Sequence, residues 1–172
     1  MRNIILAGLE GTHKLEIGKD LALKLKMKLI DTDEIMSRES GLSLPELLNK
    51  YGVKYFRSLE NKIIEKISGA SNTVIVVGGG SILQRKNVKA LKQNGFLISL
   101  ITSKIELNIN KVKDEKPLLR SQWNHLFESA KGILNLKTPG FPSADYTIDI
   151  TNLSVEEVNQ KIIDQLRRGN LD

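Results

Sequence analysis

Short apolar runs alternate with longer amphipathic segments along the 172-residue chain. Five of these runs are rich in branched aliphatic residues and stop at Gly, Asp, Ser or Thr, a pattern typical of strands that are buried on both faces of a parallel sheet. The predicted strands are Asn3–Ala7, Lys28–Asp31, Thr73–Val77, Phe96–Ile101 and Tyr146–Ile150.

Between these runs, apolar residues recur at helical spacing. The predicted helices are Leu15–Lys26, Leu44–Tyr51, Lys54–Ile67, Lys86–Asn94, Lys104–Lys113, Leu118–Gly132 and Val155–Arg167. The alternation favours one α/β domain over residues 1–172 with a doubly wound parallel sheet, which binds ligands beyond the carboxyl ends of its strands. The irregular residues 114–142 are predicted to form a lid over that site.

Composition excludes several classes of protein. The chain has no cysteine and only two histidines, His13 and His125, which excludes disulfides, thiol nucleophiles and cysteine-ligated metal clusters. The opening apolar run is too short for a signal peptide, and no other run approaches the length of a membrane span. We therefore expect a soluble, cytoplasmic protein that does not associate with a membrane.

The net charge of +6 leaves an anionic partner open. However, the lysines are spread along the predicted helices at solvent-face spacing, and aromatic residues are not interleaved with them. A solvated basic surface is favoured over a nucleic-acid interface. Since the sequence has neither a heptad repeat nor a long apolar edge, we expect a monomer.

Candidate chemistry follows three predicted strands. "GLEGTHK" follows the first, "DTD" (Asp31–Asp33) ends the second, and "GGGS" (Gly78–Ser81) follows the third, so all three segments should meet at one edge of the sheet. On the helix predicted from Lys54, Arg57 and Glu60 are three residues apart and share a face. Together these residues predict a site with a paired cation and a carboxylate.

Each segment also has a purely structural interpretation. Asp residues suit helix N-caps, so "DTD" alone is as consistent with a cap as with a site. Arg57 and Glu60 alone would usually form a surface ion pair. A single glycine suffices for a tight turn, whereas three consecutive glycines leave a stretch of backbone without side chains that a ligand can approach. The three glycines therefore favour a ligand site.

Taken together, the motifs resemble the shikimate kinase family over nearly the whole chain. The residues that match are "IDTDEIMSRESGLSLPELLNKYGVKYFRSLE", "VVGGGSIL", "KPLL" and "ADYTIDITNLSVEE", in the family's order and spacing. The resemblance implies the P-loop fold of the nucleoside-monophosphate kinases, with a five-stranded parallel sheet in the order 2-3-1-4-5 flanked by helices. It also implies transfer of the ATP γ-phosphoryl group, with Mg²⁺, to the 3-hydroxyl of shikimate, a step of aromatic amino-acid biosynthesis.

On the acceptor side, the resemblance assigns shikimate binding to Asp33, Arg57 and Gly78, Gly79 and Gly80. Asp33 matches the family carboxylate that hydrogen-bonds the substrate hydroxyls and takes or orients the reacting proton. Arg57 matches the arginine that holds the substrate carboxylate. Lys137 stands in place of a second family arginine, which keeps the charge but loses the two-pronged grip of a guanidinium.

On the donor side, the family motif G-x-x-G-x-G-K-S-T is degenerate. The segment reads Gly8, Leu9, Glu10, Gly11, Thr12, His13, Lys14, Leu15, Glu16. It keeps Gly8, Gly11 and the catalytic Lys14, but His13 replaces a glycine and Leu15 replaces the hydroxyl that binds Mg²⁺, a cation that requires oxygen ligands. Glu16 replaces a threonine beside the α-phosphate, where repulsion reaches about 4 kcal/mol at an effective dielectric constant near 20.

Further donor-side positions also depart from the family. Lys116 replaces the lid arginine, Asn110 stands where an arginine covers the adenine, and Val77 replaces a threonine. Asp31 is the remaining candidate for Mg²⁺, through a water molecule.

Because the helix from Leu15 has unpaired N–H groups at its start, an acidic side chain there can replace a phosphate. We predict that Lys14 forms an ion pair with Glu10 or Glu16.

Three hypotheses follow. The first is a shikimate kinase whose binding of ATP and Mg²⁺ is impaired, so that activity is weak or absent. The second is a catalytically inactive protein that binds shikimate or regulates a partner. The third is a kinase of the same fold for another small acceptor, such as gluconate.

Overall fold

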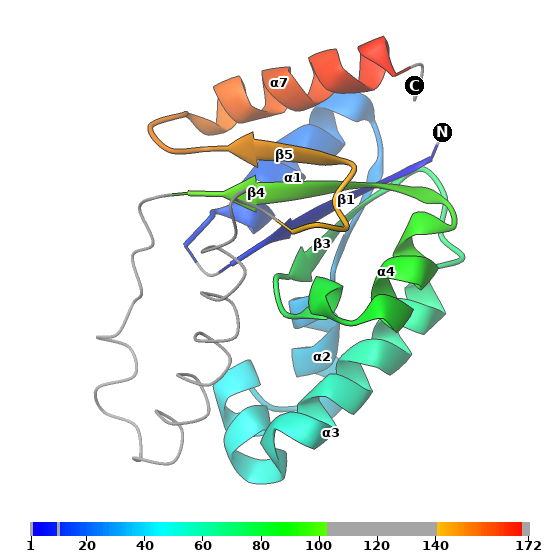
Figure 1. Cartoon of the computed structure of the whole chain (residues 1–172). Coiled ribbons are helices and arrows are strands. Elements are labelled where there is room, and N and C mark those ends of the chain that lie inside the picture. The colour runs from blue at the N-terminus through cyan, green and yellow to red at the C-terminus, as the bar shows by residue number, and fades with distance from the viewer. Residues whose placement is uncertain (1, 10, 103–140, 170–172) are drawn as a thin grey trace.

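The computed structural model describes residues 2–9, 11–102 and 141–169 (Figure 1). Its centre is one parallel sheet in the order β2-β3-β1-β4-β5. The strands are β1 (Asn3–Gly8), β2 (Lys28–Asp31), β3 (Thr73–Gly78), β4 (Gly95–Ile101) and β5 (Tyr146–Asp149). All five predicted strands and their predicted order are confirmed, with ends that differ by one residue at most.

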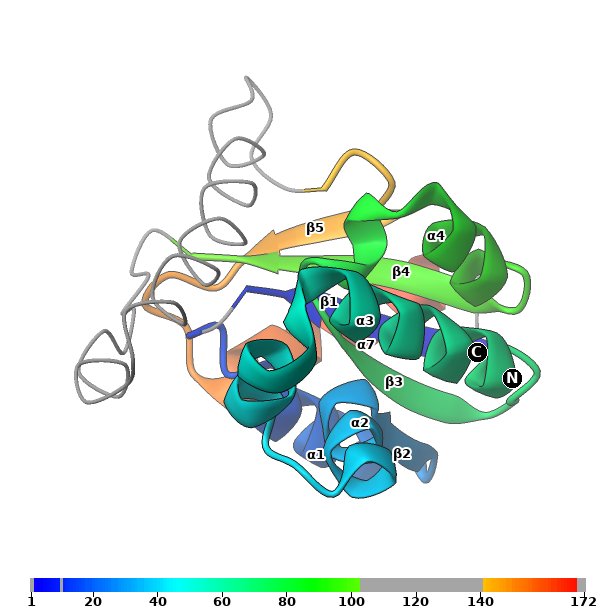
Figure 2. The ribbon, with the colours of Figure 1, turned by 90° about the horizontal axis from the view of Figure 1, so that it is seen from below.

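Helices cover both faces of the sheet (Figures 1 and 2). They are α1 (Lys14–Leu25), α2 (Thr32–Ser40), α3 (Leu44–Ile67), α4 (Arg85–Lys92) and α7 (Val155–Arg168), with a 3₁₀ turn η1 (Ser81–Leu83) before α4. On β1, Ile4 and Leu6 pack with α1 and α7, whereas Ile5 and Ala7 pack with α3 and α4. Burial on both faces explains the unbroken apolar run from Ile4 to Ala7.

Helix α2 was not predicted, because Ile35 and Met36 are its only large apolar residues and the helical period is too weak to see. Its ends are nevertheless encoded in the sequence. The Asp31 side chain accepts a hydrogen bond from the Asp33 N–H at 3.0 Å, and Gly41 ends the helix with a φ of 68°.

Helix α3 contains the two helices predicted as Leu44–Tyr51 and Lys54–Ile67. They join at Gly52, whose φ of 76° and ψ of 173° are not helical. In the second half, Ile64 and Ile67 pack against the sheet, whereas Phe56 and Ile63 pack against Met36 of α2 and the first half of α3.

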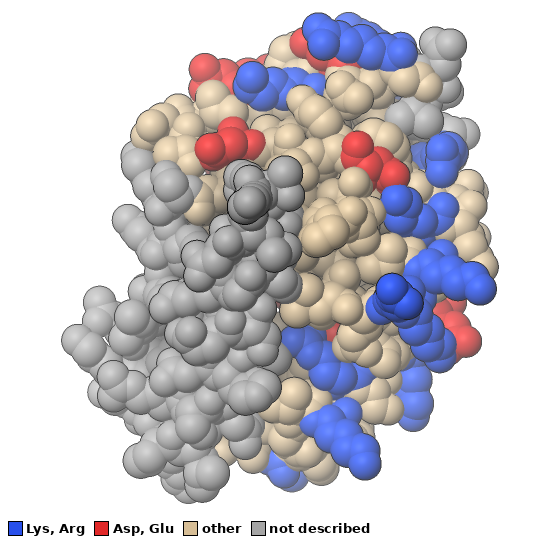
Figure 3. Space-filling model, in the orientation of Figure 1, with Lys and Arg blue, Asp and Glu red and all other residues tan. Residues whose placement is uncertain are grey.

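The helices predicted over Lys104–Lys113 and Leu118–Gly132 lie outside the described residues. So does the predicted lid, 114–142, apart from its last two residues. Among the described helices, none combines the length and apolarity that crossing a bilayer requires. On the face seen in Figure 3, Lys and Arg side chains are distributed over several elements and interspersed with acidic ones, as the spacing of the lysines predicts.

Candidate functional site

The loops that follow β1 and β3 are joined at the carboxyl edge of the sheet. β1 and β3 are neighbours, with Gly8 in register with Gly78. The Gly79 N–H donates a hydrogen bond to the Gly8 carbonyl at 3.0 Å. The first loop (residues 8, 9 and 11–13) and the glycine loop (Gly78–Gly80) therefore lie side by side, as their positions after two parallel strands predict.

Arg57 and Glu60 form a largely buried ion pair beside the glycine loop. The distance from Arg57 Nη1 to Glu60 Oε2 is 2.7 Å, and the two side chains are 22% and 3% exposed. The Ser81 hydroxyl donates to the other carboxylate oxygen, Glu60 Oε1, at 2.5 Å. The surface-pair interpretation is excluded, because a buried carboxylate needs both partners to offset its lost hydration.

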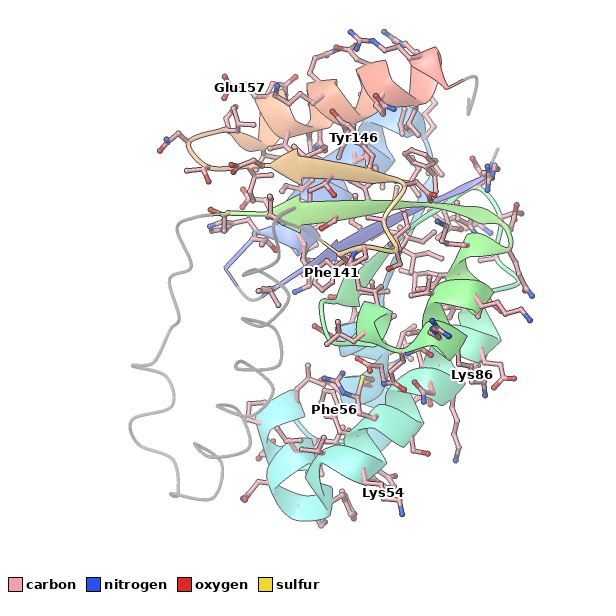
Figure 4. All side chains as sticks on the ribbon, in the orientation of Figure 1. Lys54, Phe56, Lys86, Phe141, Tyr146 and Glu157 are labelled. Carbon is pink, nitrogen blue, oxygen red and sulfur yellow. The ribbon has the colours of Figure 1, made fainter. Side chains whose placement is uncertain are left out.

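Each glycine of the loop leaves space for a particular neighbour. At Gly80, a Cβ atom would collide with the Arg57 guanidinium, lying 2.7 Å from its Cζ. At Gly79, a Cβ atom would lie 2.8 Å from Leu9 and 3.1 Å from the ring of Phe141, a residue labelled in Figure 4. The guanidinium therefore lies directly against bare backbone.

Asp33 faces Gly78, the first glycine of the loop. From a Cβ built on Gly78, Asp33 Oδ1 is 3.9 Å away, Ser81 Oγ 3.8 Å and Glu60 Oε1 4.0 Å. The structure thus brings together Asp33, Arg57 and the glycine loop from three separate segments of the sequence. The predicted site residues Lys137, Asn110 and Lys116 lie outside the described residues.

The first loop is held in a compact form that uses left-handed backbone. Gly11 has a φ of 86° and His13 a φ of 49°. A non-glycine residue in this region costs about 1–2 kcal/mol, so His13 adds strain where the family motif has glycine. Thr12 is buried and its hydroxyl donates to the Leu9 carbonyl at 2.7 Å.

Of the two partners predicted for Lys14, Glu10 or Glu16, the structure contradicts Glu16. In the described part of the chain, Glu16 lies instead near His13, with 3.8 Å between Oε2 and Nδ1. The alternative partner, Glu10, is outside the described residues. The Glu16 side chain is 69% exposed, so its repulsion of a phosphate is closer to the aqueous value of about 1 kcal/mol than to the 4 kcal/mol expected for a shielded charge.

Asp31, the candidate for Mg²⁺, lies at the end of β2 and caps α2. Burial raises the pKa of its carboxyl, while the hydrogen bond from the Asp33 N–H and the positive charge of Lys14 partly offset this. The positive charge of Lys14 therefore acts on the carboxylate at the end of β2. The ionised form of Asp31 is nevertheless destabilised in the folded protein.

We predict that Asp31→Asn stabilises the fold at neutral pH. Asparagine caps helices as well as aspartate does, and it carries no charge to be buried. Because the folded-state pKa is raised above the ordinary value of 3.8, the gain is complete above the folded-state pKa and disappears as the pH falls below 3.8. Urea unfolding of both proteins between pH 3 and pH 7 measures this; a gain independent of pH would contradict it.

An open pocket of about 880 Å³ lies between the first loop, the start of α1 and the turn that joins β5 to α7. Leu15 and Glu16 line it on one side, and Asn152 to Val155 line it on the other. The second side was not predicted as part of the site. The sequence signal for it was an asparagine, a residue type that tolerates left-handed backbone, between a predicted strand and a predicted helix. In the structure, Asn152 has a φ of 61°.

The residues around this pocket do not fit the Mg²⁺ ion of the family reaction. The hydrocarbon side chain of Leu15 cannot ligate it. Within residues 2–9, 11–102 and 141–169, no three or more His, Cys, Asp or Glu side chains are grouped so that they could hold a metal ion.

Comparisons with known proteins agree with the resemblance. A sequence model described as shikimate kinase matches residues 10–167. Shikimate kinases from Caldanaerobacter subterraneus subsp. tengcongensis and Caldicellulosiruptor bescii are 37% and 36% identical to this chain; the alignments cover 95% of the chain in both cases, and 95% and 94% of the relatives.

Solved structures show the same fold. The shikimate kinase from Acinetobacter baumannii in complex with shikimate has a TM-score of 0.78 at 23% identity, with 100% of this chain and 96% of that one covered. A gluconokinase from Sinorhizobium meliloti has a TM-score of 0.56 at 17% identity, with 99% and 95% covered.

Proposed function

Because the chain belongs to the shikimate kinase family, we propose that it binds shikimate at its acceptor side and has lost most of the ATP-dependent phosphorylation of the family. The observation that carries this proposal is an asymmetry within one site. The contacts of Arg57, Asp33 and the glycine loop are assembled, whereas the start of α1 carries Leu15 and Glu16 in place of phosphate and Mg²⁺ ligands.

Three features support binding of shikimate. Arg57 is anchored through Nη1, and its planar guanidinium can grip a carboxylate with further N–H groups. Asp33 lies across the glycine loop, where it can accept a hydrogen bond from a ring hydroxyl and orient its proton. Gly79 and Gly80 are already covered by neighbouring side chains, among them the Arg57 guanidinium. The ring of the ligand is therefore expected to lie beside Gly78, where Asp33 faces the loop.

The donor side supports weak transfer at most. Lys14 remains at the start of α1, where it can still neutralise part of the charge of a phosphoryl group. Phosphoryl transfer depends on positioning and charge neutralisation, and the loss of a Mg²⁺ ligand weakens both. Binding of ATP and Mg²⁺ is accordingly expected to be poor. If phosphoryl transfer is lost completely, the remaining function is binding of shikimate without catalysis.

Two measurements test the proposal. Calorimetry with shikimate, with gluconate as the competing acceptor, tests the acceptor side; shikimate-dependent ADP formation at several millimolar MgATP tests the donor side. We expect saturable shikimate binding, no comparable gluconate binding and little ADP. Rapid turnover that Asp33→Asn abolishes would overturn the loss of donor function, and the absence of shikimate binding by folded protein would overturn the acceptor assignment.

A further inference from the structure

We infer that Ser81 is a positioning residue, whose hydroxyl fixes Glu60 and thereby aims the Arg57 guanidinium at the carboxylate of the ligand. This inference rests on the proposed function, because it concerns how the acceptor side recognises an organic acid.

Glu60 has a different partner on each carboxylate oxygen. Oε2 accepts from Arg57 Nη1 at 2.7 Å, and Oε1 accepts from the Ser81 hydroxyl at 2.5 Å. A carboxylate held at one oxygen can pivot about its terminal bonds, whereas one held at both has a fixed plane. Ser81 therefore supplies the second point that determines the orientation of Glu60.

Ser81 is itself held firmly. It begins the η1 turn directly after the glycine loop, and its carbonyl accepts a hydrogen bond from Asn87 Nδ2 at 3.1 Å. Ser81, Asn87 and Glu60 are 0%, 1% and 2% exposed, so water does not replace these contacts. The hydroxyl thus stands at a defined place between the glycine loop and α3.

The orientation of Glu60 passes directly to Arg57. The guanidinium lies against Gly80 on one side and is bound through Nη1 to Glu60 on another. If Ser81 releases Oε1, the carboxylate can turn and accept from two guanidinium nitrogens at once, a geometry that this pair favours. The N–H groups meant for the ligand would then be taken by Glu60.

The test compares Ser81→Ala with Ser99→Ala in the full chain. Ser99 is a matched control, because it is also 0% exposed, lies on β4, and has a hydroxyl with no hydrogen-bond partner in the described part of the chain. Calorimetry measures the binding of shikimate and of an analogue whose carboxylate is replaced by a hydroxymethyl group. The side-chain ¹⁵N resonances of Arg57, assigned by their loss in Arg57→Lys, report the guanidinium without any ligand.

For Ser81→Ala we expect the Kd for shikimate to rise about tenfold, the typical effect of one charge-assisted hydrogen bond, while the Kd for the analogue stays within about twofold. The Arg57 resonances should shift and broaden in Ser81→Ala and remain unchanged in Ser99→Ala. Equal losses for both ligands would indicate a merely structural role and would overturn the inference, as would unchanged Arg57 resonances.

Failure of the proposed function and failure of the variant to fold can each be distinguished from failure of the inference. If the wild-type protein binds neither compound, the proposed function fails, and the Arg57 resonances alone decide the role of Ser81. If Ser81→Ala does not fold, Ser81→Cys, a residue of similar size and a weaker donor, is judged by the same two criteria.

Discussion

Arg57→Ala should abolish measurable shikimate binding and destabilise the fold by about 3–5 kcal/mol, the usual cost of removing one partner of a buried ion pair. The Glu60 carboxylate is 3% exposed and would keep only the Ser81 hydroxyl as a partner. The binding loss follows because the remaining acceptor-side groups have no planar cation to grip a carboxylate. Urea unfolding and calorimetry measure the two effects separately.

The double variant Arg57→Ala with Glu60→Gln separates these causes. Glutamine can still accept from Ser81 and carries no charge, so most of the lost stability should return while binding should not. If Arg57→Ala alone were as stable as the wild-type protein, the buried pair would be irrelevant to folding, and the account of the acceptor side would need revision.

The triple variant His13→Gly, Leu15→Ser and Glu16→Thr should raise MgATP affinity by about a hundredfold, corresponding to about 3 kcal/mol. Removal of the exposed Glu16 charge contributes about 1 kcal/mol, whereas relief of the left-handed His13 stabilises the free and the bound protein equally. The restored hydroxyl at position 15 supplies the remainder as a Mg²⁺ ligand. Fluorescent-nucleotide titration with and without Mg²⁺ measures the gain.

Leu23→Ser is the matched control for this variant, because Leu23 is 79% exposed on the same helix and does not line the pocket. It should leave nucleotide affinity unchanged. If the triple variant gains nothing, the lesion lies elsewhere, with Val77 and Lys116 as the next positions to restore.

The strands were predictable because burial on both faces gives a central strand a continuous apolar run, such as Ile4 to Ala7 in β1. Helix α2 was not predictable from a hydrophobic period, because only its caps, Asp31 and Gly41, mark it in the sequence. The break in α3 at Gly52 was predicted as two separate helices, since a glycine interrupts the pattern at the point where the backbone leaves helical geometry.

The site was predictable where a motif has a fixed relation to a strand end, as for Asp33 and the glycine loop. The contact between Glu16 and His13 was not predictable, because it depends on the direction that the left-handed backbone gives to the His13 side chain. The role of Ser81 depends on a contact with Glu60 across 21 positions of sequence, and no local pattern signals it.

Gly8 has a structural role that does not involve a nucleotide. A methyl group at this position would lie 2.5 Å from the Thr12 hydroxyl and 3.3 Å from the Leu100 carbonyl. The carbonyl of Gly8 also accepts the hydrogen bond from the Gly79 N–H. Natural selection for a folded acceptor side is therefore enough to retain this glycine in a chain that does not bind ATP. In surveys of genomes, survival of the first motif glycine should not count as evidence of kinase activity in this lineage; positions 13 and 15 are the informative ones.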